Sequence, residues 1–213
     1  MGKLMFNKKR IKMRKTKLTI VVLAVLTLLF ATKAFIFNGP SAEEAALENI
    51  MTRTSIRSYT NEPVSDEQVE KLLRAGMAAP SAANAQPWKF IVIRDKAMLQ
   101  ELSDSLSNAR IVAGADLAII VAGDQRKMAE GDLRDYWVDD AAAATENILL
   151  AANAMGLGAV WTGIYPRKWI EDPIRKITDM PSYLIPLSMV PIGHPAGVHK
   201  PIDKWKSENV IYK

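Results

Sequence analysis

The sequence has 213 residues, of which 49% are hydrophobic and 24% charged, a composition typical of one ordinary globular domain rather than of a disordered or repetitive chain. It contains no cysteine, which excludes disulfides, thiolate catalysis and thiolate-bound zinc or iron–sulfur centres. The net charge is +5, and eight cations without an acid fall within the first 17 residues, so subtracting them leaves −3 on the rest. The body of the chain therefore lacks the basic charge of a nucleic-acid-binding protein.

The basic stretch over residues 1–17 precedes an apolar run over residues 18–37, LTIVVLAVLTLLFATKAFIF. At 1.5 Å per residue, this run is about long enough to cross a ~30 Å hydrocarbon core. Cations before such a run favour a cytoplasmic N-terminus, and the cleavage motifs after it are poor. We therefore expect a basic cytoplasmic segment (1–17), then a single-pass transmembrane anchor or uncleaved signal (18–37), with the body outside the membrane. Export after signal cleavage is the alternative.

The body of the chain begins near Ser41, which is expected to cap a helix with two acids in its first turn. Beyond Ser41, apolar periodicity and breaker residues predict helices that alternate with strands. The expected helices are 42–52, 65–78, 96–108, 136–155 and 166–177. The expected strands are 88–94, 116–122, 158–162 and 185–192. This alternation indicates an α/β or α+β domain around a single sheet.

Directly after the first helix of the body comes the segment Arg53-Thr54-Ser55-Ile56-Arg57. It places two guanidinium groups four residues apart with a serine hydroxyl between them. Guanidinium groups bind phosphate and other planar oxyanions through paired hydrogen bonds, and serine adds a neutral donor. The segment is a candidate anion site, with a solvated basic turn as the alternative.

The loop over residues 79–88, APSAANAQPW, connects a predicted helix to a predicted strand. Two prolines bracket Ser81, Asn84 and Gln86, which makes a stiff loop that presents amides and backbone groups. Such a surface suits a polar heterocycle, because several neutral donors and acceptors are held in place. An ordinary turn is the alternative interpretation.

The segment over residues 156–163, GLGAVWTG, invites comparison with the dinucleotide-binding glycine motif. The order of elements is wrong for that motif, because a Rossmann motif opens a helix after a strand. These glycines instead close a helix and precede a strand. Gly156 is better interpreted as a helix C-cap.

The remaining acids and histidines give little support for catalysis by side chains. Asp139 and Asp140 are neighbours in a predicted helix and point about 100° apart, so we interpret them as surface acids rather than as an acid/base pair. His194 and His199 are the only histidines, and no third ligand is spaced to join them. No metal site is expected.

Four segments in this order, RTSIR, APSAANAQPW, WVDDAAAATENILLAANAMGLGAVWTGIYP and VPIGHP, resemble the FMN-dependent nitroreductase family from about Asn49 to the C-terminus. The resemblance implies an α+β, nitroreductase-like flavin domain over residues 41–213, with a central, mostly antiparallel sheet flanked by helices. It also implies a homodimer whose sites lie at the subunit interface, with FMN as cofactor and NAD(P)H as co-substrate.

The resemblance also implies roles for individual residues. Arg53 and Ser55, with Thr54 between them, would hold the FMN phosphate, and Arg57 would reach the pyrimidine edge, where reduction leaves negative charge. Residues of the loop would approach the flavin of the partner chain: Pro80, Ser81, Ala82, Asn84 and Gln86. Near the flavin ring would lie Asn108, Trp161, Thr162 and Gly163. His199 stands where the family usually has a phosphate-binding arginine, so the implied substitute is Lys200 or Lys204.

The implied function is that of an oxidoreductase that transfers electrons from NAD(P)H to nitroaromatics, quinones or similar acceptors in two half-reactions. No catalytic side chain is needed, because the flavin carries the chemistry. Two alternatives stay open: a reductive dehalogenase-type flavin enzyme on the same fold, and a membrane-tethered flavin-binding protein without activity. Neither alternative calls for a metal or a nucleic acid.

Overall fold

The computed structural model describes residues 19–28, 39–107 and 109–213. The chain divides into two compact units, Met1–Ala46 and Leu47–Lys213. The helix α2 (Ala42–Thr52) begins after Ser41, as the sequence predicts. The Ser41 hydroxyl accepts a hydrogen bond from the Glu44 N–H at 3.1 Å, and the Glu44 carboxylate accepts one from the Ser41 N–H at 2.8 Å. These two bonds satisfy N–H groups that the first turn of the helix would otherwise leave unpaired.

The predicted transmembrane helix over residues 18–37 is wrong. Residue 18 and residues 29–37 lie outside the described residues, as does the basic segment over residues 1–17. Of the predicted span, residues 19–28 are described, and they are helical. Across the described ranges, no helix combines the length and the apolar character needed to cross a membrane. The predicted localisation, in the membrane with the body of the chain outside, rested on that helix and is wrong with it.

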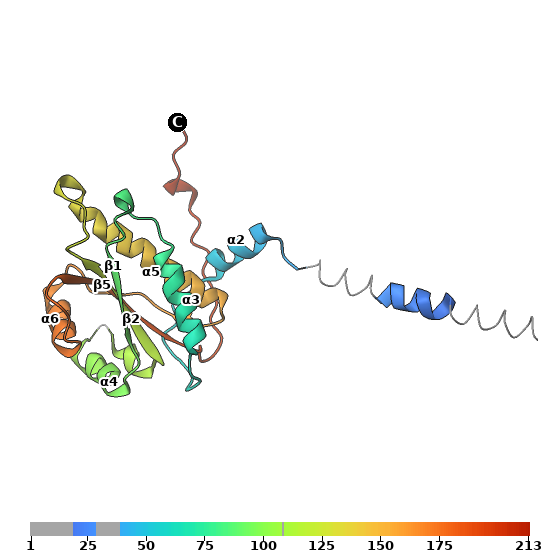
Figure 1. Cartoon of the computed structure of the whole chain (residues 1–213), viewed down its shortest axis with the longest axis horizontal. Helices are drawn as coiled ribbons and strands as arrows, with labels where there is room; N and C mark the ends of the chain where they lie inside the picture. Colours follow the sequence, from blue (N-terminus) through green and yellow to red (C-terminus); the bar gives the residue numbers. More distant parts are fainter. Residues whose placement is uncertain (1–18, 29–38, 108) are drawn as a thin grey trace, which may run out of the picture. The chain divides into compact units, whose positions relative to one another are not determined.

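The larger unit is built on one sheet in which every pair of neighbouring strands is antiparallel (Figure 1). The strand order is β1-β2-β5-β3, and β4 also pairs with β5. The strands are β1 (Trp88–Ile93), β2 (Leu117–Asp124), β3 (Gly158–Ala159), β4 (Thr162–Gly163) and β5 (Leu184–Gly193). An antiparallel sheet flanked by helices is the α+β arrangement that the resemblance implies, so the error in the predicted fold class concerns the transmembrane helix.

The strand predicted over residues 158–162 is divided into β3 and β4. Both pair with β5 in one register. In that register Pro191 of β5 stands opposite Val160, and proline has no N–H to donate to the ladder. The Pro191 carbonyl instead accepts a hydrogen bond from the Tyr59 hydroxyl at 3.2 Å. The missing donor of Pro191 accounts for the interruption between the two short strands.

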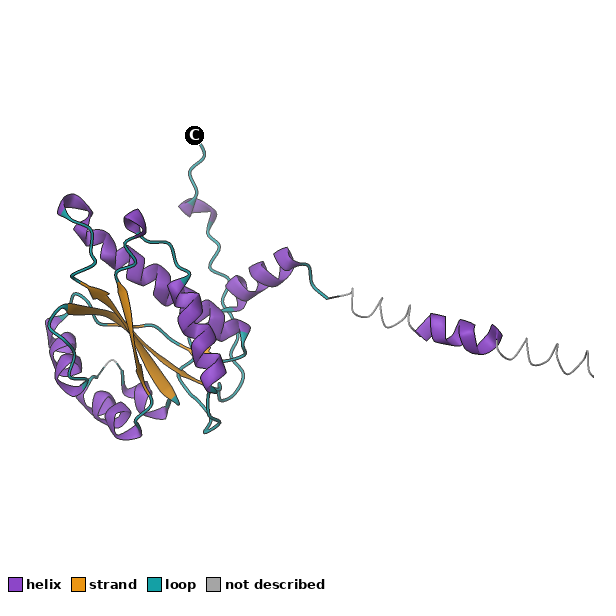
Figure 2. Ribbon diagram, in the orientation of Figure 1, coloured by secondary structure: helices purple, strands orange, loops and turns teal. Residues whose placement is uncertain are grey.

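Helices cover both faces of the sheet (Figure 2). They are α3 (Asp66–Met77), α4 (Lys96–Ser105), α5 (Trp137–Ala154) and α6 (Lys168–Ile177). Short 3-10 turns lie at Ala82–Asn84 (η1), Arg110–Gly114 (η2), Gly131–Tyr136 (η3) and Ser207–Asn209 (η4). The helix predicted over residues 96–108 ends early, because Leu106 has extended backbone angles. Gly156 follows α5 with φ +70°, as expected for a glycine that ends a helix.

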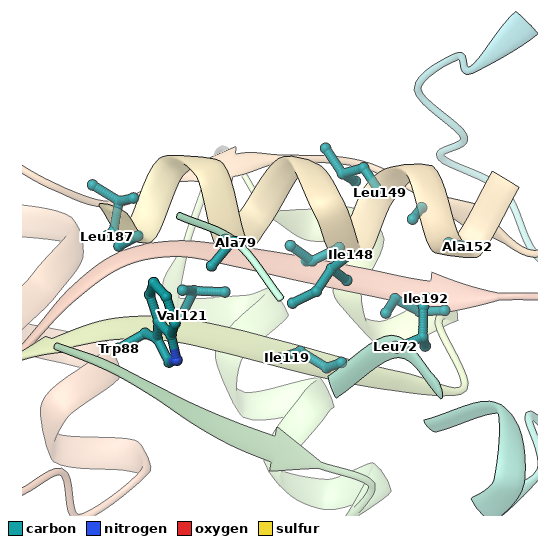
Figure 3. Packing of buried hydrophobic residues seen from close by; sticks show 14 of the residues in the cluster. Leu72, Ala79, Trp88, Ile119, Val121, Ile148, Leu149, Ala152, Leu187 and Ile192 are labelled. Carbon is teal, nitrogen blue, oxygen red and sulfur yellow. The ribbon is translucent and has the colours of Figure 1, made fainter. Parts of the chain in front are cut away.

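β2 is buried along its whole length, and its alternate residues point to opposite faces of the sheet. Leu117, Ile119 and Val121 pack with residues of α3 and α5, whereas Ala118, Ile120 and Ala122 pack with residues of α4 and α6. On the first face, Leu72 of α3 and Ile148 of α5 are completely buried (Figure 3). α5 is therefore fixed on the sheet, so that side chains elsewhere on it can serve as rigid supports.

Candidate functional site

The segment over residues 53–57 follows α2 and lies beside β3. The Ile56 N–H donates a hydrogen bond to the Ala159 carbonyl at 3.0 Å, and the Ile56 side chain is buried. A Cβ atom at position 158 would lie 2.5 Å from Cγ2 of Ile56, so the segment can lie this close only because residue 158 is glycine. The structure thus joins the predicted anion-binding segment to the strand that leads into the predicted ring-contacting residues.

Arg53 is held against α5. Its Nε lies 3.4 Å from Oε1 of Glu146, and its side chain is 17% exposed. Arg53 and Lys204 line the same cavity of about 310 Å³, which one acid, Asp203, also lines. Asp203 and the Glu146 carboxylate balance the two cations in charge, but Arg53 and Lys204 still provide the guanidinium and ammonium donors that bind anions.

The other basic and hydroxyl residues of the predicted phosphate site lie nearer the surface. Thr54 and Ser55 are half-buried, and Arg57 is exposed. Nη1 of Arg57 donates a hydrogen bond to the Ser55 carbonyl at 3.4 Å, which folds the arginine back over the segment. Of the two C-terminal lysines that the resemblance implies, Lys204 lines the cavity with Arg53, whereas Lys200 is exposed and does not line it.

The loop over residues 80–86 is shaped by its backbone. Ala83, Asn84 and Gln86 have φ values of 49°, 54° and 48°, a region that non-glycine residues seldom adopt. Inside the loop, the Ser81 hydroxyl accepts a hydrogen bond from the Gln86 N–H at 3.0 Å. The Gln86 side-chain amide donates to Oδ1 of Asn84 at 2.9 Å. The predicted polar residues of the loop are therefore bound to one another.

Asp140 connects this loop to α5. Its carboxylate accepts a hydrogen bond from the Ala82 N–H at 2.8 Å, and the residue is 5% exposed. Burial raises the pKa of the Asp140 carboxyl, and the hydrogen bond from Ala82 opposes that rise in part. The interpretation of Asp139 and Asp140 as two surface acids is wrong for Asp140, because the loop covers it. Together with Pro80 and Ser81, Asp140 lines a second cavity of about 480 Å³.

The predicted ring-contacting residues lie at the edge of the sheet. Trp161 is 36% exposed, and the Thr162 hydroxyl donates a hydrogen bond to the Met189 carbonyl at 2.6 Å. The Gly163 carbonyl accepts one from Nη2 of Arg167 at 2.6 Å. The fourth residue of this set, Asn108, lies outside the described residues.

The two parts of the predicted site lie on different sides of α5. Asp140, which holds the loop, and Glu146, which contacts Arg53, are six residues apart. In an α-helix, this spacing separates them by about 9 Å along the axis and by about 120° around it. The structure therefore brings the segment over residues 53–57 together with Lys204 and β3, whereas the loop over residues 80–86 faces another direction.

A family model described as "Nitroreductase family" matches residues 50–125 and 100–194 of the chain. The chain belongs to the nitroreductase family. It is 44% identical over 152 residues to a protein of Archaeoglobus fulgidus that is provisionally named NADH dehydrogenase/NAD(P)H nitroreductase, and the match covers 71% of this chain and 86% of the relative. The prediction that the protein is an oxidoreductase enzyme is confirmed by the family and by this relative.

Solved structures of nitroreductase-family proteins share the fold. A crystal structure from Bacteroides thetaiotaomicron, of a protein with the same provisional name, is 42% identical, with a TM-score of 0.75 over 79% of this chain and 96% of that chain. A provisionally named nitroreductase from Desulfovibrio desulfuricans, solved in complex with FMN, is 34% identical, with a TM-score of 0.68 over 82% of this chain and 98% of that chain.

The sequence of this nitroreductase-family chain does not predict two residues of the candidate site, Glu146 and Asp140. Glu146 carries no local signal for its contact with Arg53, which lies far away in the sequence. Asp140 does carry one, because it is four residues before Ala144 and eight before Ile148, both of which are buried. That spacing places Asp140 on the buried side of α5, where an acid needs a hydrogen-bond donor.

Proposed function

We propose that residues 41–213 form a flavin domain that binds FMN and transfers electrons from NAD(P)H to a small acceptor, with nitroaromatics and quinones as the acceptor class. Membership of the nitroreductase family supports this proposal. The name of the Archaeoglobus relative refers to NADH and NAD(P)H, and the Desulfovibrio structure contains FMN, so both cofactors predicted from the sequence agree with these relatives.

The observation that carries the proposal is the cavity shared by Arg53 and Lys204. FMN ends in a phosphate, and a guanidinium group beside an ammonium group is a suitable pair for it. The contact between Arg53 and Glu146 is made through Nε, so the terminal nitrogens of the guanidinium group can bind phosphate oxygens. The residues present therefore fit the phosphate end of FMN.

The remaining residues of the segment and of β4 take positions along the cofactor. Ser55 adds a hydroxyl donor to the phosphate, and Arg57 lies two residues further, where its guanidinium can stabilise negative charge on the pyrimidine edge. Trp161, Thr162 and Gly163 bring the edge of the sheet against the ring. Bound FMN supplies the chemistry of hydride and electron transfer, so that these side chains bind, orient and shield rather than act as acids or bases.

A second copy of the chain completes the site in this proposal. The loop over residues 80–86 and Arg53 are supported from different sides of α5, which agrees with a site to which two chains contribute. The C-terminal segment exposes large apolar side chains, with exposed fractions from 69% to 91%: Val198, Ile202, Trp205, Ile211 and Tyr212. An exposed apolar surface of this kind is typical of an interface, and we infer a homodimer.

FMN titration of the full chain, followed by flavin fluorescence, tests the cofactor. Arg53→Ala should weaken binding by about ten- to a hundredfold, because a hydrogen bond to a charged group contributes roughly 1.5 to 3 kcal/mol. Arg74→Ala is the matched control, since Arg74 is an exposed arginine paired with Glu70 within α3, and it should bind FMN as the unaltered chain does. An unaltered chain that takes up no FMN would contradict the proposed function.

Anaerobic addition of NADH or NADPH to the FMN-loaded chain should bleach the flavin absorbance, and a nitroaromatic or quinone should restore it. A flavin that keeps its absorbance with both nucleotides would point to a binding protein without this activity. Sedimentation of the loaded chain should show a dimer. A monomer that retains one FMN per chain would contradict the shared site.

A further inference from the structure

The loop over residues 80–86 has one hydrogen bond to another element of the fold, within the part of the chain that the structure describes. The bonds of Ser81, Asn84, Ala85 and Gln86 stay inside the loop. The exception is the Ala82 N–H, which donates to the Asp140 carboxylate at 2.8 Å. Among the described residues, this is therefore the hydrogen bond that ties the loop itself to α5.

Burial of the acceptor, the Asp140 carboxylate, costs folding free energy. Asp140 is 5% exposed, and no ion pair joins it to a cation among the described residues. A buried carboxylate without a cation is unfavourable for folding, and its neighbour Asp139 adds a second negative charge to the same turn. Its place in the first turn of α5 offsets part of that cost, since negative charge is favourable at the start of a helix. Among the described residues, the hydrogen bond from the Ala82 N–H is the specific contact that the Asp140 carboxylate makes.

We propose that Asp140 is a positioning residue for the cofactor: by accepting the Ala82 N–H, it holds the loop over residues 80–86 in the conformation that presents Ser81, Asn84 and Gln86 to FMN. The inference rests on the proposed function, since it takes FMN as the ligand of the loop. Asp140 is fixed by α5, which is packed on the sheet, so it can orient a loop whose backbone is otherwise strained. It acts through Ala82 and need not touch the flavin.

The test compares Asp140→Ala, Asp140→Asn and Asp139→Ala in the full chain. FMN affinity is measured by flavin fluorescence, and the visible circular dichroism of bound FMN reports the surroundings of the ring. Asp140→Ala should weaken FMN binding by about tenfold and change the dichroism, because the Ala82 N–H loses its acceptor. Asp140→Asn keeps an acceptor oxygen and should stay close to the unaltered chain. Asp139→Ala removes the same charge from an exposed neighbour and should have no effect.

A variant on the loop side keeps the test decisive if Asp140→Ala fails to fold. Ala82→Pro deletes the donor while Asp140 stays intact. Position 82 is the first residue of η1, where proline is well tolerated, and Ser81 before it already has the extended angles that proline requires (φ −142°, ψ 151°). Ala82→Pro should weaken FMN binding as Asp140→Ala does, and the double variant should be no weaker than either single one.

The outcomes separate this inference from the proposed function. Unchanged FMN affinity and dichroism in Asp140→Ala and Ala82→Pro would overturn the positioning role while leaving FMN binding intact. Equal losses in Asp140→Asn and Asp140→Ala would overturn it too, because the amide oxygen preserves the acceptor. An unaltered chain that binds no FMN would overturn both the proposed function and this inference.

Discussion

Arg53 and the loop over residues 80–86 are both supported by α5, but by different interactions. Arg53 is joined to α5 by an ion pair with the half-exposed Glu146, and next to it Ile56 is buried against β3. The loop carries three non-glycine residues with positive φ and is tied to α5 through the buried carboxylate of Asp140.

The difference shows what positions each part of the candidate site. A partly exposed ion pair contributes about 0 to 1 kcal/mol, so the segment that carries Arg53 is positioned mainly by the packing of Ile56. The loop has no such buried anchor of its own among residues 81–86, none of which is buried. Its position depends on backbone conformation and on one hydrogen bond. Packing should therefore control one part of the site, and backbone and hydrogen bonding the other.

The largest expected effect comes from a change that loosens the packing of α5, because α5 supports both Arg53 and the loop. Ile148 is completely buried between α5 and the sheet. Ile148→Ala should lower the free energy of unfolding by about 3 kcal/mol through lost burial and a residual cavity, measured by urea denaturation. Met77→Ala, at a side chain of α3 that is 54% exposed, is the control and should cost far less. Equal losses would mean that α5 is not a tightly packed support.

A change at Gly158 should affect the part of the site that contains Arg53. An added Cβ would meet Cγ2 of Ile56 at 2.5 Å and its Cβ at 2.9 Å, so Ile56 must move. Gly158→Ala should cost about 2 kcal/mol of folding stability, in the range of other overpacked cores, and should weaken FMN binding. Gly114→Ala adds a methyl group where nothing lies within 4 Å, so it should leave FMN binding unchanged. Unchanged FMN affinity in Gly158→Ala would break the link between packing and this part of the site.

A smaller effect is expected from the backbone of the loop. Ala83 has φ 49°, whereas Ala85 has φ −67°. Ala83→Gly should stabilise the chain by up to about 1 kcal/mol, because the left-handed conformation costs a non-glycine residue roughly that much. Ala85→Gly should instead destabilise it by about 0.5 to 1 kcal/mol, because glycine gains freedom in the unfolded chain. Urea denaturation of the two variants should show opposite signs, and equal signs would contradict strain at Ala83.

The smallest expected effect is the dependence on pH that Asp140 introduces. Since burial raises its pKa above the ordinary value of 3.8, the folded chain binds the Asp140 proton more tightly than the unfolded chain does. The stability that this provides is present below pH 3.8 and is lost as the pH rises through the pKa of the folded state. Asp140→Asn should therefore be more stable than the unaltered chain at neutral pH, with a difference that shrinks in acid. Asp139→Asn controls for the removal of one charge, and an advantage of Asp140→Asn that grew in acid would contradict the raised pKa.

Local signals in the sequence were sufficient for most of the elements. Ser65 and Gln68 form a capping box at the start of α3, and Gly156 ends α5. These features depend on residues a few positions apart, which is why they can be read from the sequence. The predicted transmembrane helix shows the limit of the same method, because no helix among the described residues has the length and apolar character to cross a membrane.

By itself, the sequence determined which segments carry guanidinium, hydroxyl and amide groups, since these groups keep their chemical character wherever the chain places them. Which of these groups meet was decided by the tertiary structure. Arg53 lines a cavity with Lys204 rather than with Lys200, and it contacts Glu146. Asp140 is buried under the loop. Each of these contacts joins residues that are distant in the sequence. Such contacts arise only when α5 packs on the sheet, because that packing chooses which side chains of the helix are covered and which neighbours they face.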